Sequence, residues 1–199
     1  MTAPDQAAMA AAVRSFLRAA GRPLTGELVG TPERVAEAWA QDFLDGYALS
    51  TEKALGPLIP IGPTGGLVCV TGIDFHASCP HHLLPYRGLA HVAYLPSQGV
   101  VGFSRLGRLV DALAHRLVLQ EALAAEIASE LARGTRARGA ACVLEAEQAC
   151  LSCRGIHRRR GRAHAEAFVG EFARSAELRG RFARAISAGA SPFGLEAAR

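Results

Sequence analysis

Residues 76–82 place one cysteine and three histidines between two short apolar runs, and this cluster limits the folds open to the chain. Cys79 and His82 have the Cys-x-x-His spacing with which a tight turn presents sulfur and nitrogen to one tetrahedral ion. The flanking runs, 67–71 and 88–95, are rich in β-branched and other apolar residues and are typical of strands. We therefore expect two strands with a metal-binding turn between them.

A catalytic zinc needs a third protein ligand, and a Cys-x-x-Cys segment far along the chain supplies candidates. Cys150 and Cys153 form that segment, immediately before Arg154. Three protein ligands leave the fourth position open for water, whereas four make a structural site. From the residues alone, a structural zinc with Cys153 or His76 as its fourth ligand stays open. His81 lies beside the metal turn, where it is free to move protons.

Composition excludes several classes of protein. The chain has 199 residues, 50% of them hydrophobic, which is enough for one good core. It has no basic leader and no apolar run of the roughly 18 residues that a membrane helix needs, so we expect a cytoplasmic protein with no membrane partner. Five cysteines, one pair in Cys-x-x-Cys, favour metal binding over disulfides, and Cys69 and Cys142 lie in apolar runs typical of a core. The net charge is +4, but few aromatics lie among the arginines, and we expect no nucleic-acid partner.

The remaining pattern predicts an α+β protein. Helical periodicity marks 6–20 and a second helix that begins with Thr31 as N-cap and runs towards Gly46. A Gly/Pro-rich connector at 56–66 suggests a boundary, so we predict an N-terminal helical region, 1–60, and a catalytic domain, 61–199. In that domain we predict strands at 67–71, 88–95, 100–103, 139–148 and 163–172, and helices at 105–114, 119–131 (ended by Gly134) and 175–187. His91 falls in a predicted strand and is expected to be a satisfied or half-exposed strand residue rather than a ligand.

Two predicted helix starts carry polar residues with functional potential. Ser104, as an expected N-cap, is followed by Arg105 and Arg108 one turn apart. A hydroxyl and two cations at a positive helix end form an anion site, although a solvated face accounts for arginines equally well. Gln120 and Glu121 begin the next helix, either to bind a base or as ordinary first-turn residues.

Together these segments resemble the GTP cyclohydrolase I family in order and spacing. The resemblance spans roughly residues 30–190 and rests on an ordered set of motifs: Thr31-Pro-x-Arg34, Cys79-Pro-His-His-Leu-Leu-Pro-Tyr86, His91-Val-Ala-Tyr-Leu-Pro96, Gly102-Phe-Ser-Arg-Leu106, Gln120-Glu121 and Cys150-x-x-x-Arg-Gly155. It implies the tunnelling fold (T-fold), an antiparallel sheet with helices packed on one face. It also implies a ring-shaped homo-oligomer, with a decamer as one expected size and active sites between subunits.

The resemblance implies an activity and roles for particular residues. The family uses Zn²⁺ to open the guanine imidazole ring of GTP at carbon 8, releases formate and forms 7,8-dihydroneopterin triphosphate. The implied zinc ligands are Cys79, His82 and Cys150. His81 corresponds to the proton-transfer histidine, and Glu121, with Gln120 beside it, to the carboxylate that accepts the guanine N–H donors. The implied triphosphate contacts are Ser104, Arg105, Arg108, Arg154 and Arg34.

The chain departs from the family pattern at several of these positions. The family's Cys-Glu-His-His has Pro80 in place of the acid, a lysine is Arg105, and a basic residue of the N-terminal helix is Glu37. The histidine two residues before the third zinc ligand is Gln148, which can orient a water or a carbonyl but carries no proton at neutral pH. Two other hypotheses therefore stay open. One is a T-fold zinc hydrolase that stops at the formamide or acts on a related purine nucleotide, and the other is a non-catalytic nucleotide-binding paralogue.

Overall fold

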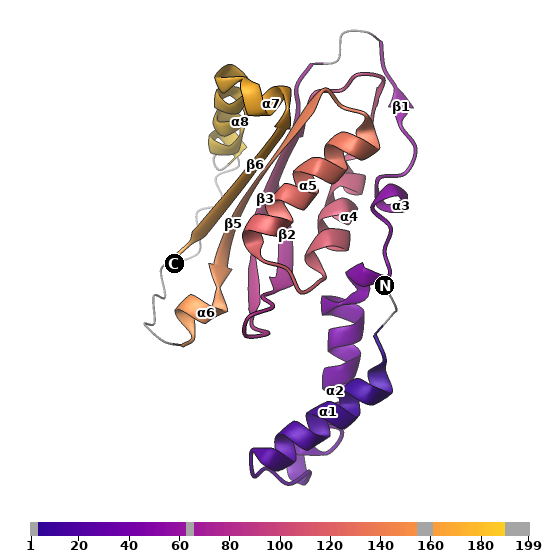
Figure 1. Ribbon diagram of the computed structural model, residues 1–199, viewed down its shortest axis with the longest axis vertical. Helices are drawn as coiled ribbons and strands as arrows, with labels where there is room; N and C mark the ends of the chain where they lie inside the picture. Colours follow the sequence, from indigo (N-terminus) through magenta and orange to yellow (C-terminus); the bar gives the residue numbers. More distant parts are fainter. Residues whose placement is uncertain (1–3, 63–65, 155–160, 190–199) are drawn as a thin grey trace.

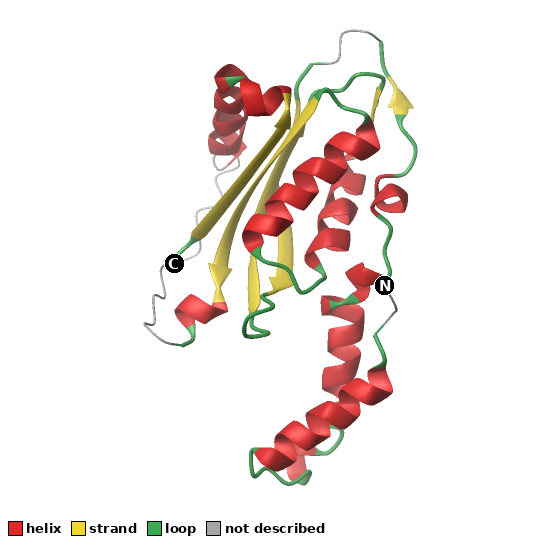
Figure 2. Cartoon of the chain, viewed as in Figure 1, coloured by secondary structure: helices red, strands yellow, loops and turns green. Residues whose placement is uncertain are grey.

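A four-stranded antiparallel sheet forms the centre of the computed structural model, which describes residues 4–62, 66–154 and 161–189 (Figure 1). The strands lie in the order β2 (Val68–Ser78), β3 (Pro85–Tyr94), β5 (Gly139–Gln148) and β6 (Ala163–Gly170). The helices α4 (Phe103–Ala114) and α5 (Gln120–Thr135) cover one face of the sheet (Figures 1 and 2). The predicted α+β class, with helices packed on one face of an antiparallel sheet, is confirmed.

The core is divided between the two faces of the sheet, because successive side chains of a strand point to opposite sides. Val92 and Tyr94 of β3 belong to the main buried cluster, together with the apolar side chains of α4 and α5. Ala93, between them, belongs to a smaller cluster with Phe172 and Phe182. These two phenylalanines come from α7 (Glu171–Arg174) and α8 (Ala176–Gly189), which lie on the other side of the sheet (Figure 1).

The N-terminal segment forms a helical hairpin that extends away from the sheet (Figure 1). It comprises α1 (Gln6–Ala19), η1 (Gly26–Leu28) and α2 (Thr31–Ala38), and the side chain of Asp5 caps α1. The chain returns to the sheet through η2 (Trp39–Phe43), η3 (Asp45–Tyr47) and α3 (Thr51–Leu55), after which β1 (Ile59–Pro60) pairs with β4 (Gly99–Val100). Within the described ranges, no helix is both long and apolar enough to cross a membrane.

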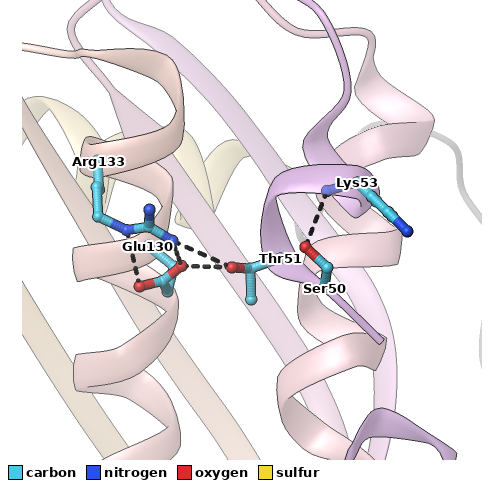
Figure 3. Close-up of polar contacts among 5 residues, drawn as sticks. All are labelled: Ser50, Thr51, Lys53, Glu130 and Arg133. Atoms are coloured by element: carbon cyan, nitrogen blue, oxygen red, sulfur yellow. Dashed lines mark hydrogen bonds and ion pairs between the residues drawn. The ribbon is translucent and has the colours of Figure 1, made fainter. Parts of the chain in front are cut away.

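A small polar network attaches α3 to α5 (Figure 3). Glu130 of α5 accepts hydrogen bonds from Thr51 and from Arg133, and Arg133 also donates to the Thr51 hydroxyl. Hydrogen bonding to Arg133 lowers the pKa of Glu130 despite its partial burial. The Ser50 hydroxyl accepts from the backbone N–H of Lys53 and so caps α3.

Two helices begin one or two residues before the predicted positions. Gly30, in the left-handed conformation with φ of 73°, precedes α2, so Thr31 is its first helical residue rather than its N-cap. The N-cap of α4 is Gly102, and Ser104 is therefore its second residue. In both cases a glycine at the cap position replaces the side-chain cap that the hydroxyl residue suggests.

Glycines that were expected to end elements are instead used for close packing or for a bend. The predicted stop at Gly134 is wrong: α5 continues to Thr135, and a Cβ on Gly134 would lie 2.3 Å from the Leu55 side chain. Gly72, with φ of 75°, lies where the β2–β3 register shifts, and β2 continues through this bulge to Ser78. The strand thus reaches the Cys/His turn, whereas the sequence pattern predicted its end near residue 71.

Candidate functional site

The turn between β2 and β3 carries Cys79, His81 and His82. The Leu83 N–H donates to the Cys79 carbonyl (2.9 Å), and the Cys79 N–H donates to the Leu84 carbonyl (3.0 Å). Leu83 has a φ of 54°, a left-handed conformation that costs energy for a leucine, so these bonds hold the turn against backbone preference. Cys79 is buried, whereas both histidines are exposed.

The segment before α5 is fastened directly to this turn. The Val118 N–H donates to the Ser78 carbonyl (3.1 Å), and the buried Tyr86 hydroxyl donates to the Val118 carbonyl (3.0 Å). Glu121, exposed in the first turn of α5, therefore lies near Cys79. Burial, and then the nearby Cys79 and Glu121, raise the pKa of Tyr86, which keeps its hydroxyl protonated.

The end of β5 brings Gln148 to the same place. Gln148 pairs with Tyr86 across the β3–β5 ladder, and its amide donates to the Gln120 carbonyl oxygen (2.7 Å). The Gln120 amide in turn donates to the carbonyls of Leu144 and Ala163, both at 3.0 Å. Gln120 is only 4% exposed, so both its N–H groups and its oxygen are engaged inside the protein. Sequence reasoning did not foresee this arrangement.

Cys150 follows Gln148 in the short helix α6 (Ala149–Ser152), where it is half-buried, and Cys153 is exposed just after it. Two thiols and an imidazole are donors that suit zinc. The strands that lead to Cys79 and Cys150 are β2 and β5, and they lie on either side of β3. Among the described residues, however, no three His, Cys, Asp or Glu side chains lie close enough to hold one metal ion. Cys142 is buried and Cys69 partly buried, as expected of core residues.

Four of the five expected phosphate contacts come from the N-terminal segment and α4, and only Arg154 is adjacent in sequence to the second cysteine pair. Arg34 donates to two carbonyls and one hydroxyl of its own loop, and Arg105 donates to a carbonyl of α3 (3.4 Å). Ser104 and Arg108 are exposed on α4, and Arg154 is exposed just before the undescribed segment 155–160. Because α4 and α5 are antiparallel neighbours, their N-termini lie at opposite ends of the helix layer (Figure 1). The chain alone therefore does not gather Ser104 and Glu121 into one site.

A histidine pair at the junction with the N-terminal segment was also not foreseen. The rings of His76 and His115 stack with centroids 4.5 Å apart. His115 Nδ1 lies 2.8 Å from a carboxylate oxygen of Asp45, and His76 Nε2 lies 2.9 Å from the Asp42 carbonyl. Burial raises the pKa of Asp111, and the two nearby histidines oppose that shift. The only sequence signal for this cluster is a histidine at the end of a predicted helix.

Known proteins resemble this chain over nearly its whole length. The family model described as GTP cyclohydrolase I matches residues 9–187. GTP cyclohydrolase 1 of Ralstonia nicotianae is 43% identical over 176 residues, which cover 88% of this chain and 84% of the relative. The enzyme of the same name from Chromobacterium violaceum is 42% identical over 183 residues, 92% of this chain and 88% of the relative. The Brucella anthropi protein is 42% identical over 181 residues, 90% and 84% of the two chains. With its antiparallel sheet and helical face agreeing with these matches, the chain belongs to the GTP cyclohydrolase I family of enzymes and has that family's T-fold.

Proposed function

We propose that this protein hydrolyses the imidazole ring of GTP at carbon 8, releases formate and forms 7,8-dihydroneopterin triphosphate. The observation that carries the proposal is the meeting of the Cys79 turn, the start of α5 with Glu121 and the end of β5 with Gln148 around the buried Tyr86. Similarity to proteins named GTP cyclohydrolase 1 along nearly the whole chain supports the same substrate.

Cys79, His82 and Cys150 would hold a Zn²⁺ ion, because two thiolates and an imidazole are preferred zinc ligands and leave one position open. When bound, zinc supplies Lewis-acid activation of water at neutral pH. His81, exposed in the same turn, would transfer protons to and from the opening ring. The alternative with Cys153 as a ligand is tested by the zinc analysis of cysteine variants in the Discussion.

Glu121 would anchor the base. A carboxylate in the first turn of α5 is stabilised by the positive end of that helix and can accept the amino and ring N–H groups of guanine together. A purine that lacks those donors would leave the carboxylate unpaired. This is the physical basis for choosing a guanine nucleotide over other purines.

The triphosphate would be bound by the cationic and hydroxyl set Ser104, Arg105, Arg108, Arg154 and Arg34. Since Ser104 lies at the opposite end of the helix layer from Glu121, a complete site requires residues from another copy of the chain. We therefore propose a homo-oligomeric ring with active sites between subunits, acting in the cytoplasm without a nucleic-acid or membrane partner. The division into a helical region, 1–60, and a catalytic domain, 61–199, is part of the same proposal.

The direct test is incubation of the zinc-analysed protein with GTP while formate and the absorbance and fluorescence of the pterin are followed together. Equal amounts of formate and pterin support the full reaction, and Glu121→Gln should lose most of it. A second candidate is a hydrolase that opens the ring and stops at the formamide. Gln148 favours this candidate because its amide neither takes up nor releases a proton at neutral pH. Ring opening without pterin would establish that candidate, and GTP binding without chemistry would point to the non-catalytic paralogue.

A further inference from the structure

We propose that Gln120 is a positioning residue that fixes the amide of Gln148, so that Gln148 offers the substrate a permanent hydrogen-bond acceptor. The identity of the ligand rests on the proposed function, but the orientation of the two amides does not. The ligand class is an N–H or O–H donor of a guanine nucleotide, or a water held by it.

The orientation of Gln120 is dictated by the backbone around it. Its amide nitrogen faces the carbonyls of Leu144, in β5, and Ala163, at the start of β6. A carbonyl can only accept, so both Gln120 N–H groups must point at these two oxygens. The flipped amide would place its oxygen against two carbonyl oxygens in a position that is only 4% exposed. One orientation of Gln120 is therefore strongly preferred.

The orientation of Gln148 follows from that of Gln120. Only the Gln120 oxygen is left to meet Gln148, so the Gln148 amide nitrogen must face it, as the 2.7 Å contact has it. The Gln148 oxygen is then turned away from Gln120. Within the described residues, that oxygen has no hydrogen-bond partner, and Gln148 is half-buried rather than enclosed. It is an acceptor in a fixed place with nothing of the described chain to accept from.

The location of this acceptor connects it to the candidate site. Gln148 pairs with Tyr86 in the sheet and precedes Cys150 by two residues. A neutral acceptor held there favours a ligand group with a hydrogen to give and disfavours one with lone pairs only. A glutamine whose rotation is prevented also orients its ligand at little entropic cost, which is what positioning requires.

The test is a double-mutant cycle on GTP turnover with Gln148→Met, Gln120→Met and the double variant. Methionine keeps the length of glutamine. Gln148→Met removes the acceptor oxygen, and Gln120→Met removes the amide that orients it. Gln98→Met is the matched control, because Gln98 is exposed in the turn before β4, where Arg136 is its one hydrogen-bond partner among the residues that the structure describes. We expect kcat/KM to fall about tenfold in each single variant, a typical loss for one positioned hydrogen bond, and no further in the double variant. The control should stay within about twofold of the native chain.

Two results would overturn the proposal. One is an unchanged kcat/KM in Gln148→Met, and the other is a double variant whose loss is the product of the two single losses. If Gln120→Met fails to fold, Gln148→His provides the second measurement. Its ring can donate one N–H to Gln120 and keep the other nitrogen as an acceptor, so the KM for GTP should stay within about threefold of the native value. KM is the readout here because a histidine can also carry a proton and so change kcat. A rise in KM as large as that in Gln148→Met would contradict the assigned acceptor role.

A native chain that neither binds nor converts GTP would refute the proposed function. The fixed orientation of the Gln148 amide by Gln120 would then need a separate test. In that case a high-resolution crystal structure of native protein and of Gln120→Met decides it. The Gln148 amide should occupy one orientation in the native chain and both orientations in the variant. A single orientation of the Gln148 amide in both structures would refute the role assigned to Gln120.

Discussion

Replacing Tyr86 by phenylalanine should weaken both the fold and the guanine end of the site. Tyr86 is 1% exposed, and among the described residues its hydroxyl makes one hydrogen bond, to the carbonyl of Val118. That bond joins β3 to the segment that begins α5, and Glu121 lies three residues further on. Removing the hydroxyl leaves a buried carbonyl without this partner and frees the start of α5 to shift.

The magnitude follows from the burial of both partners. An unsatisfied buried carbonyl costs roughly 1–3 kcal/mol, so we expect the free energy of unfolding to fall by about 2 kcal/mol. For a chain of this size that is a decrease of about 4–8 °C in the melting temperature. Misplacement of Glu121 should lower kcat/KM for GTP by about tenfold, since small shifts of a positioning residue cost that much. Because burial raises the Tyr86 pKa, these differences should not change between about pH 6 and 9.

The assay is thermal unfolding at fixed protein concentration together with steady-state kinetics of pterin formation. Phe182→Leu is the matched control, because it removes a similar amount of stability, about 1–2 kcal/mol, from the cluster on the other face of the sheet. It should lower the melting temperature without changing kcat/KM more than about twofold. Equal kinetic losses in Tyr86→Phe and Phe182→Leu would refute the reasoning, since the effect would then be one of general stability.

Three further predictions concern packing, metal binding and pH. Gly88→Ala should lower the free energy of unfolding by at least about 3 kcal/mol, because its Cβ would lie 1.8 Å from a backbone oxygen of β5. Gly107 in α4 has open space around it, so Gly107→Ala should instead raise the free energy of unfolding by about 0.5–1 kcal/mol. Denaturant titrations measure both changes. Cys150→Ser should lose bound zinc by elemental analysis while Cys153→Ser keeps it, and the reverse result would move the third ligand to Cys153. His91 is buried and its Nδ1 accepts a backbone N–H, and burial lowers its pKa from 6.5. The contribution of His91 to stability is therefore complete above pH 6.5 and is lost as the pH falls through the lowered pKa. Below about pH 6, chemical denaturation should show a smaller decrease in the free energy of unfolding for His91→Phe than for the native chain.

Local pattern was sufficient for the kinds and order of most elements. The helix at 6–20 and the strands at 88–95 and 139–148 were predicted within a few residues, because apolar periodicity and turn residues are local properties. Element ends were less predictable. Gly134 looked like a helix stop, but its lack of a side chain makes room for Leu55, a residue distant in the sequence. The boundary at residue 60 stays a prediction.

The sequence by itself determined the chemistry available to this protein: the Cys/His turn, the second cysteine pair, the acid at a helix start and the glutamine in place of a histidine. It also determined the α+β class and the family. Only the tertiary structure decided that Tyr86 joins the metal turn to α5, that Gln120 is engaged inside the protein rather than exposed, and that Gln148 is held in one orientation. Each of these depends on hydrogen bonds between residues 24 to 43 positions apart. Such pairings are set by strand register and helix packing, which no local pattern of residues encodes.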